Sequence, residues 1–159
     1  GVAPALMMYR MLQMSAQQES NIFLNSLPAL LIACCAVWRL AKFNIDARQS
    51  TTFFGVPTPI TAMVVASLLL VVHYNEWDLQ KVLLNQWVLY AITLLLSIMM
   101  VVDVPIMSLK FKDYTFKNNQ PKFILVGLSI VLLIIFRWAA IPLVYICYVL
   151  LSLLFRKKI

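Results

Sequence analysis

Long apolar runs alternate with short polar stretches along the 159 residues of this chain. Several runs approach the roughly 20 residues that a helix needs to cross the hydrocarbon core of a bilayer. The runs cover residues 1–14, 21–40, 59–73, 82–107 and 122–155. This pattern predicts an all-α, polytopic transmembrane helix bundle, with about five full spans plus the end of a preceding one.

The first and last runs have unusual lengths. Residues 1–14 are too short to span alone and lack the cationic start of a signal peptide, so we interpret them as the second half of a helix. The 34 positions of 122–155 would form a helix of about 51 Å, too long for a core of about 30 Å. Arg137 would be costly inside a single span, whereas beside Trp138 at an interface it is ordinary. We therefore predict two short spans with a close turn at Arg137 and Trp138.

The composition places this bundle in a membrane. Hydrophobic residues make up 63% of the chain and charged residues only 12%, whereas ordinary globular chains are about a quarter charged. The net charge of +7 could indicate nucleic acid as a partner, but the cations lie at the ends of apolar runs rather than on one soluble face. We expect an integral membrane protein with no nucleic-acid partner.

The distribution of lysine and arginine predicts the orientation. With alternating spans, ten of the thirteen cations fall in the 39–58 loop, the 108–122 loop and the C-terminal tail, and three fall on the other side. Cytoplasmic loops carry the excess of lysine and arginine. We predict a multi-pass protein of the cell inner (plasma) membrane with a cytoplasmic C-terminus and a cytoplasmic active side.

Two polar motifs, WRLAKFN at 38–44 and FFGVPTP at 53–59, flank the same predicted cytoplasmic loop. Pro57 suits the start of a helix, where a missing backbone N–H costs little, and Gly55 permits a left-handed turn before it. One interpretation is structural: one helix ends, the next begins, and the cations reach lipid phosphate. The other interpretation is a cationic pocket at the membrane surface, and the residues alone leave both open.

The pocket interpretation depends on three side chains of the first motif. Arg39 and Lys42 are three residues apart, so they share one face of a helix. Arginine can hold a phosphate or carboxylate with two parallel hydrogen bonds, lysine adds a compact charge, and Asn44 adds neutral donors and an acceptor. Such a set suits an anionic lipid headgroup or a nucleotide pyrophosphate.

GVAPA at the start, RLAKFN and FFGVPTP resemble the corresponding motifs of bacterial-type phosphatidylserine synthases, which are CDP-diacylglycerol–serine O-phosphatidyltransferases of the CDP-alcohol phosphatidyltransferase superfamily. The family's usual forms are close to RLARFN and FxGLPxP, so Lys42 and Val56 depart from them while keeping the chemical type. The resemblance covers residues 1 to about 112. It divides the chain into 1–108, the C-terminal part of the membrane core, and 109–159, a cytoplasmic loop, a final hairpin and a basic tail.

The resemblance implies transfer of a phosphatidyl group from CDP-diacylglycerol to L-serine, with release of CMP, in a homodimer among membrane lipids. It makes Arg39, Lys42, Asn44, Gly55 and Pro57 the expected substrate-binding residues.

The resemblance also implies where the catalytic residues lie. The family carries DxxDGxxAR and GxxxDxxxD immediately before GVAPA, and those aspartates bind divalent metal (Mg or Mn). This motif is absent here, so the catalytic aspartates are expected upstream of Gly1. We expect no catalytic residue and no metal ligand in this chain, and no activity from this chain alone.

The acids of the chain do not replace that motif, because no two of them show the four-residue spacing that would place both on one helix face. Asp103 lies near the inner end of an apolar span, where an acid is a functional candidate. We expect it to be neutralised by Lys110 or Lys112. Two alternatives remain: a related phosphatidyltransferase with another alcohol acceptor, and a non-catalytic membrane bundle such as a transporter or scaffold segment.

Overall fold

The computed structural model describes residues 1–16, 21–45, 53–75, 78–106 and 120–154. This part of the chain is helical apart from one antiparallel pairing of two residues with two, so the predicted all-α class is confirmed. The elements are α1 (Val2–Ser15), α2 (Ile22–Ser26), the 3-10 helix η1 (Leu27–Leu30), α3 (Leu31–Ile45), β1 (Phe53–Phe54), α4 (Thr58–Tyr74), α5 (Gln80–Leu83), α6 (Gln86–Val101), β2 (Pro105–Ile106), α7 (Gln120–Phe136), the 3-10 helix η4 (Arg137–Ala139) and α8 (Ala140–Leu154).

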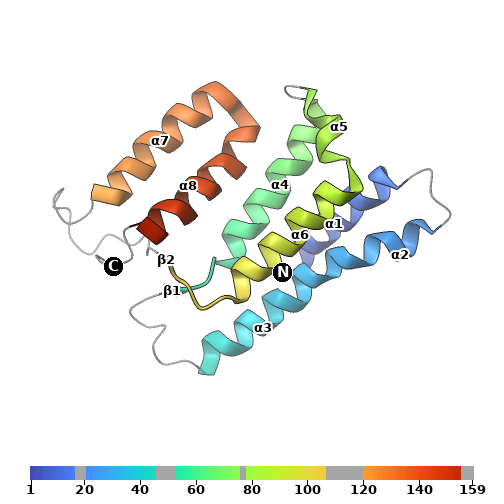
Figure 1. Ribbon diagram of the computed structural model, residues 1–159, viewed down its shortest axis with the longest axis horizontal. Coiled ribbons are helices and arrows are strands. Elements are labelled where there is room, and N and C mark those ends of the chain that lie inside the picture. Colours follow the sequence, from blue (N-terminus) through green and yellow to red (C-terminus); the bar gives the residue numbers. More distant parts are fainter. Residues whose placement is uncertain (17–20, 46–52, 76–77, 107–119, 155–159) are drawn as a thin grey trace.

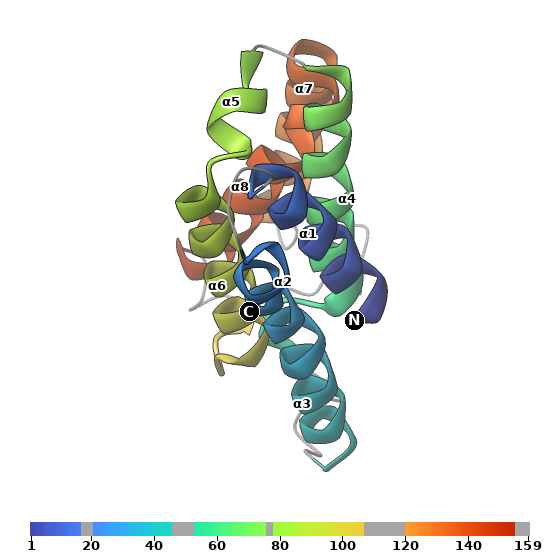
Figure 2. The same cartoon turned by 90° about the vertical axis from the view of Figure 1, so that its right-hand side faces the viewer.

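The helices form one bundle with α1, α4 and α6 at its centre (Figure 1). α1 packs on α4 and η1, α3 packs along α6, and α4 packs on α8. The fully buried core side chains come mainly from the central helices, for example Met8 and Met11 of α1, Val65 of α4 and Leu96 of α6. In Figure 2 the C-terminal part of α3 extends beyond the rest of the bundle. One flank of α3 therefore packs on α6 while its last turns stand clear of the core.

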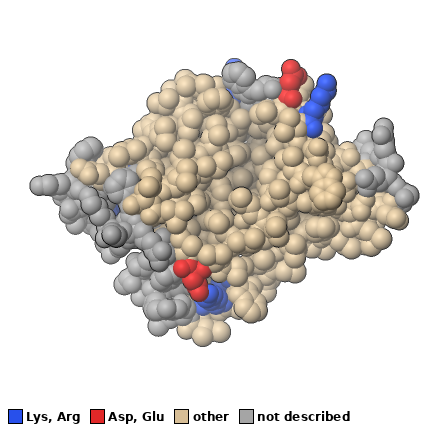
Figure 3. All heavy atoms as spheres, viewed as in Figure 1, with Lys and Arg blue, Asp and Glu red and all other residues tan. Residues whose placement is uncertain are grey.

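Apolar side chains cover the outside of the bundle as well as its inside. Trp87 is 80% exposed, and Ile134 and Leu154 are each 77% exposed. In Figure 3 the visible charged atoms of the described residues lie at two opposite edges of the molecule, with uncharged surface between them. Contiguous exposed apolar surface of this extent is rare on soluble monomers and marks contact with a membrane or a partner. The structure thus favours a membrane protein.

Within the described ranges, two helical stretches are long and apolar enough to cross a membrane, Ile22–Ile45 and Lys122–Leu154. The helices α4 and α6 are apolar but shorter, with 17 and 16 residues. The predicted five spans, the multi-pass topology and its orientation therefore stay predictions.

The second of these stretches is folded back on itself, as the sequence predicts. α7 and α8 pack against each other as a hairpin, and the turn between them is η4, where Arg137 has φ +47°. Positive φ is uncommon outside glycine and marks a sharp change of chain direction. At 1.5 Å per residue, arms of 17 and 15 residues are about 26 and 22 Å long, somewhat less than a core of about 30 Å.

Two predicted boundaries are wrong. The helical run that begins at Ile22 continues to Ile45 rather than ending at Leu40, so all of RLAKFN lies inside α3, as the predicted shared helix face of Arg39 and Lys42 requires. The 82–107 run is not one helix either. Asn85 interrupts it by capping α6, with its side chain accepting a hydrogen bond from the Trp87 N–H at 3.0 Å, and α6 ends at Val101.

Candidate functional site

The turn at residues 55–57 lies against the C-terminal end of α6. β1 pairs with β2, with Phe53 opposite Ile106 and Phe54 opposite Pro105. The chain then turns through Gly55, whose N–H donates to the Val104 carbonyl at 3.0 Å. The next residue, Val56, is fully buried and donates its N–H to the Met99 carbonyl at 2.9 Å. These bonds fix the position of the turn relative to α6.

Gly55 is required at this position for two reasons. Its φ is +72°, in the left-handed region that residues with a Cβ rarely adopt. A Cβ added here would also lie 2.7 Å from the Met100 carbonyl oxygen and 3.1 Å from that of Val102. Both neighbours are backbone atoms, which cannot rotate away as a side chain can.

The prolines of the second motif start α4, as predicted. Pro57 is the N-cap residue, with φ −57° and ψ 135°, and Pro59 is the second residue of the helix. Neither position needs a backbone N–H for an intrahelical hydrogen bond. The Pro57 carbonyl accepts hydrogen bonds from the Ile60 and Thr61 N–H groups at 3.0 and 3.3 Å. Pro57 therefore ends the turn and caps the start of α4.

Arg39 joins the two motifs. Its guanidinium Nη2 donates to the Gly55 carbonyl oxygen at 3.3 Å, across 16 residues of sequence. The side chain is half-buried, and its Nε is buried with no hydrogen-bond partner among the described residues. An unsatisfied buried donor on a cation costs free energy unless another group accepts from it. The guanidinium is thus held by the turn through Nη2, while its Nε is left without an acceptor in the described part of the chain.

Lys42, one turn further along α3, forms an ion pair with Asp103. Its Nζ lies 2.5 Å from the Asp103 Oδ1, and the two side chains are 33% and 56% exposed. The sequence predicts Lys110 or Lys112 as the partner of Asp103, and both lie outside the described residues. The partner in the structure is Lys42, because α3 packs along α6 and brings the end of one helix beside the residues that follow the other.

Of the five residues predicted to bind substrate, the structure joins Arg39 directly to Gly55, and Pro57 belongs to the same turn. Lys42 reaches the site from the adjacent turn of α3 through Asp103. Asn44 lies on the last turn of α3, and its side chain is exposed. The site is therefore built from α3, the 55–57 turn and the segment after α6.

Gly1, the first residue of the GVAPA motif, lies against α3. It is the N-cap residue of α1, and a Cβ added to it would lie 2.5 Å from the Ala36 Cβ. Ala36 precedes Arg39 by three residues on the same helix, so α1 begins about one turn from the cationic site. The structure gives Gly1 itself a packing role and no chemical one. The catalytic aspartates expected upstream of Gly1 are not among these 159 residues and stay a prediction.

One neighbour of this site was not predicted. Tyr148 on α8 lies close enough to Arg39 for the two to interact electrostatically. Tyr145 and Tyr148 are buried on α8, which packs against β2. The available signal was two phenol groups at helical spacing in an otherwise apolar run, because a buried tyrosine hydroxyl needs a polar partner.

The described part of the site offers cations and backbone groups rather than a cluster of metal ligands. Within the described ranges, no group of three or more His, Cys, Asp or Glu side chains could hold a metal ion. A divalent cation such as Mg²⁺ is bound through carboxylate oxygens, and Asp103 here is paired with Lys42. The described residues therefore do not fit a divalent metal, and they provide cations and backbone dipoles instead.

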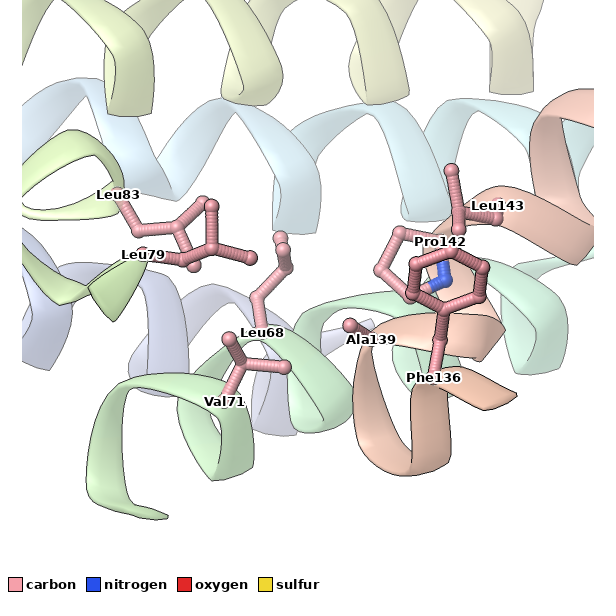
Figure 4. A pocket seen from close by; sticks show the side chains of 8 residues that line it. All are labelled: Leu68, Val71, Leu79, Leu83, Phe136, Ala139, Pro142 and Leu143. Carbon is pink, nitrogen blue, oxygen red and sulfur yellow. The ribbon is translucent and has the colours of Figure 1, made fainter. Parts of the chain in front are cut away.

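A cavity of about 360 Å³ lies near the other end of the bundle and is entirely apolar (Figure 4). It lies between α4, the α5 region and the turn of the α7–α8 hairpin. Its lining residues are Leu68, Val71, Leu79, Leu83, Phe136, Ala139, Pro142 and Leu143. A pocket without polar groups cannot orient a charged headgroup or catalyse its transfer. This cavity is therefore a poor candidate for the site of headgroup chemistry.

Comparison with known proteins relates part of the chain to two enzymes of phospholipid synthesis. The chain is 34% identical over 76 residues to the archaetidylserine synthase of Methanothermobacter thermautotrophicus, which is 48% of this chain and 30% of that enzyme. It is 36% identical over 63 residues to the CDP-diacylglycerol–serine O-phosphatidyltransferase of Bacillus subtilis, which is 40% of this chain and 33% of that enzyme.

The matches thus span about a third of the length of these curated relatives. No family model matches the chain, and no solved structure matches it. The two relatives support a relationship to transferases of the CDP-alcohol phosphatidyltransferase type.

Proposed function

We propose that this chain is part of a membrane-embedded transferase that moves a phosphatidyl group from CDP-diacylglycerol to the hydroxyl of L-serine, forming phosphatidylserine and CMP. One observation carries the proposal: the two motifs that resemble this family are distant in sequence and are joined by the hydrogen bond from Arg39 to the Gly55 carbonyl oxygen. The partial similarity to an archaetidylserine synthase and to a CDP-diacylglycerol–serine O-phosphatidyltransferase supports the same assignment.

In this proposal Arg39 binds an oxyanion of a substrate, either the pyrophosphate of the lipid or the carboxylate of serine. A guanidinium can form two parallel hydrogen bonds to such a group. The Gly55 carbonyl holds the guanidinium in place, so less side-chain entropy is lost on binding. The 55–57 turn forms the floor of the site, and Lys42 adds positive charge beside it.

The divalent metal and the base that accepts the serine proton belong to residues outside the described part of this chain. The metal would polarise the pyrophosphate, and this chain's own residues bind and orient the substrates. On this basis the 159 residues alone have no transferase activity. Homodimer formation and the cytoplasmic position of the site are parts of the same proposal.

Kinetics of Arg39→Lys test the proposal in the complete enzyme that contains this chain, purified in detergent. The substitution keeps the charge but removes the two-pronged contact. We expect a loss of about 10- to 150-fold in kcat/KM for CMP release, equivalent to about 1.5–3 kcal/mol for one charge-assisted contact. Arg39→Ala should lose more, and Lys42→Arg should be tolerated because it keeps a cation beside Asp103.

Arg10→Lys is the matched control, because Arg10 is exposed on α1 and its contact among the described residues is a hydrogen bond to Gln13 on the same helix. It should behave as wild type. With saturating CDP-diacylglycerol, a raised KM for serine would assign Arg39 to the acceptor carboxylate. An unchanged KM for serine with poorer use of the lipid would assign it to the pyrophosphate. If Arg39→Lys matched Arg10→Lys in both kinetic constants, Arg39 would be a lipid anchor and the proposed site would be wrong.

A further inference from the structure

Asp103 is the acid that the described structure places beside the cationic site. Two of the six acids of the chain, Asp78 and Asp103, fall within the described residues, and Asp78 is bonded to Asn75 at the end of α4. Asp103 instead pairs with Lys42 on α3. A receptor for a purely anionic ligand gains nothing from a carboxylate at its edge, because like charges repel.

Arg39 and Asp103 lie on the two sides of the same turn residue. The Gly55 carbonyl oxygen accepts from Arg39 at 3.3 Å, and the Gly55 N–H donates to the carbonyl of Val104, the residue after Asp103, at 3.0 Å. Gly55 therefore contacts the guanidinium through its carbonyl and the segment that carries Asp103 through its N–H. The turn brings a cation and an acid into one neighbourhood, where a small ligand with both charges can find a partner for each.

The carboxylate of Asp103 can accept more hydrogen bonds than the one from Lys42. An ionised carboxylate offers about four acceptor positions on two oxygens, and the ion pair with Lys42 uses Oδ1. The Asp103 side chain is 56% exposed, so a solute can reach it. Beyond the contact with Lys42 that the described residues show, its other acceptor positions suit a group that donates several hydrogen bonds and carries positive charge.

We propose that Asp103 binds the ammonium group of a zwitterionic acceptor and so selects an amino acid over other alcohols. This inference rests on the proposed function and deepens it. The acceptor carboxylate lies at Arg39, its ammonium group lies at Asp103, and its hydroxyl remains free for transfer. An anionic alcohol such as a sugar phosphate or glycerol phosphate is repelled by Asp103. A neutral alcohol gains no charge-assisted contact from it.

The competing role for Asp103 is to hold Lys42 in position without touching the ligand. Asp103→Asn separates the two roles, because the amide oxygen still accepts a hydrogen bond from Lys42 while the negative charge is lost. Asp78→Asn is the matched control: the same change at an exposed acid bonded to Asn75. Both variants keep the size of the side chain, and thermal unfolding of each confirms that it folds.

The experiment compares three acceptors in the complete enzyme purified in detergent, by calorimetric binding in the presence of CDP-diacylglycerol and by CMP release. L-serine carries both charges, L-glycerate has a hydroxyl in place of the ammonium group, and ethanolamine lacks the carboxylate. Asp103→Asn should weaken serine binding by about tenfold or more and leave glycerate unchanged or improved. Asp78→Asn should leave the binding of both serine and glycerate unchanged.

The inference is overturned if the wild type binds serine and glycerate equally, or if Asp103→Asn weakens both ligands to the same extent or neither. Serine binding that depends on Asp103 without CMP release from the wild type would instead sink the proposed transferase function and leave the ammonium site standing. CMP release by the wild type with equal use of serine and glycerate would refute the ammonium site and leave the proposed transferase function standing. The two failures are therefore distinguishable.

Discussion

Replacing Gly55 with alanine should destabilise the protein far more than its small size suggests. The residue has φ +72°, and an alanine Cβ would lie 2.7 Å from the Met100 carbonyl oxygen. The turn must therefore move away from the end of α6. That movement disturbs the hydrogen bond from Gly55 to Val104, which anchors the turn to the segment carrying Asp103.

The magnitude follows from these two effects. A left-handed conformation costs a residue with a Cβ about 1–2 kcal/mol. Each backbone hydrogen bond that is weakened costs about 0.5–1.5 kcal/mol, and more if a buried group is left unpaired. We expect the free energy of unfolding to fall by at least about 2 kcal/mol. For a chain of this size that corresponds to a loss of about 4 °C or more in Tm.

Gly127→Ala is the matched control for this prediction. A Cβ at Gly127 meets nothing within 4 Å, and the residue lies inside α7. Alanine is better than glycine in a helix interior by about 1 kcal/mol, so the same substitution should raise Tm there. Thermal unfolding of both variants in one detergent, followed by circular dichroism, compares them directly. Equal Tm changes in the two variants would refute the reasoning from the Gly55 geometry.

Three further predictions concern the rest of the molecule. Ala139→Leu, which extends a side chain into the 360 Å³ apolar cavity, should stabilise the protein by about 0.5–2 kcal/mol in thermal unfolding, and a lower Tm would show that the cavity is not open to filling. Tyr148→Phe should lower kcat/KM in the complete enzyme several-fold if the hydroxyl helps to hold Arg39, whereas wild-type kinetics would remove Tyr148 from the site. Single cysteines at Asn75 and Asn119, in a background without the native cysteines, should be labelled by an impermeant maleimide from opposite sides of the membrane, and labelling from one side would contradict the predicted span count.

The parts of the fold that the sequence predicts well depend on length and local chemistry. The α7–α8 turn follows from a run too long for one span with an arginine and a tryptophan at its centre. The start of α4 follows from the proline and glycine positions. The break at Asn85 was also readable, because asparagine is a favoured N-cap residue. Hydrophobicity alone joins residues 82–107 into one run and does not detect this cap.

The parts that could not be predicted depend on packing between distant segments. Lys42 and Asp103 are 61 residues apart, and no local pattern indicates that α3 lies along α6. Closeness in sequence favours Lys110 and Lys112 as partners of Asp103 instead. The proximity of Tyr148 to Arg39 is of the same kind. It depends on the final hairpin, which carries no motif.

The three polar residues of RLAKFN differ in how firmly the structure holds them, and this orders their expected importance. Arg39 is half-buried and bonded to the turn, Lys42 is partly exposed and paired with a side chain, and Asn44 is exposed on the last turn of α3. A group that is already fixed loses less entropy when it binds a ligand, so its contact contributes more to affinity. The α3 helix extends past the bundle (Figure 2), so this order follows distance from the core. Substrate contacts at Arg39 should therefore dominate, with Lys42 acting mainly through its charge and its contact with Asp103.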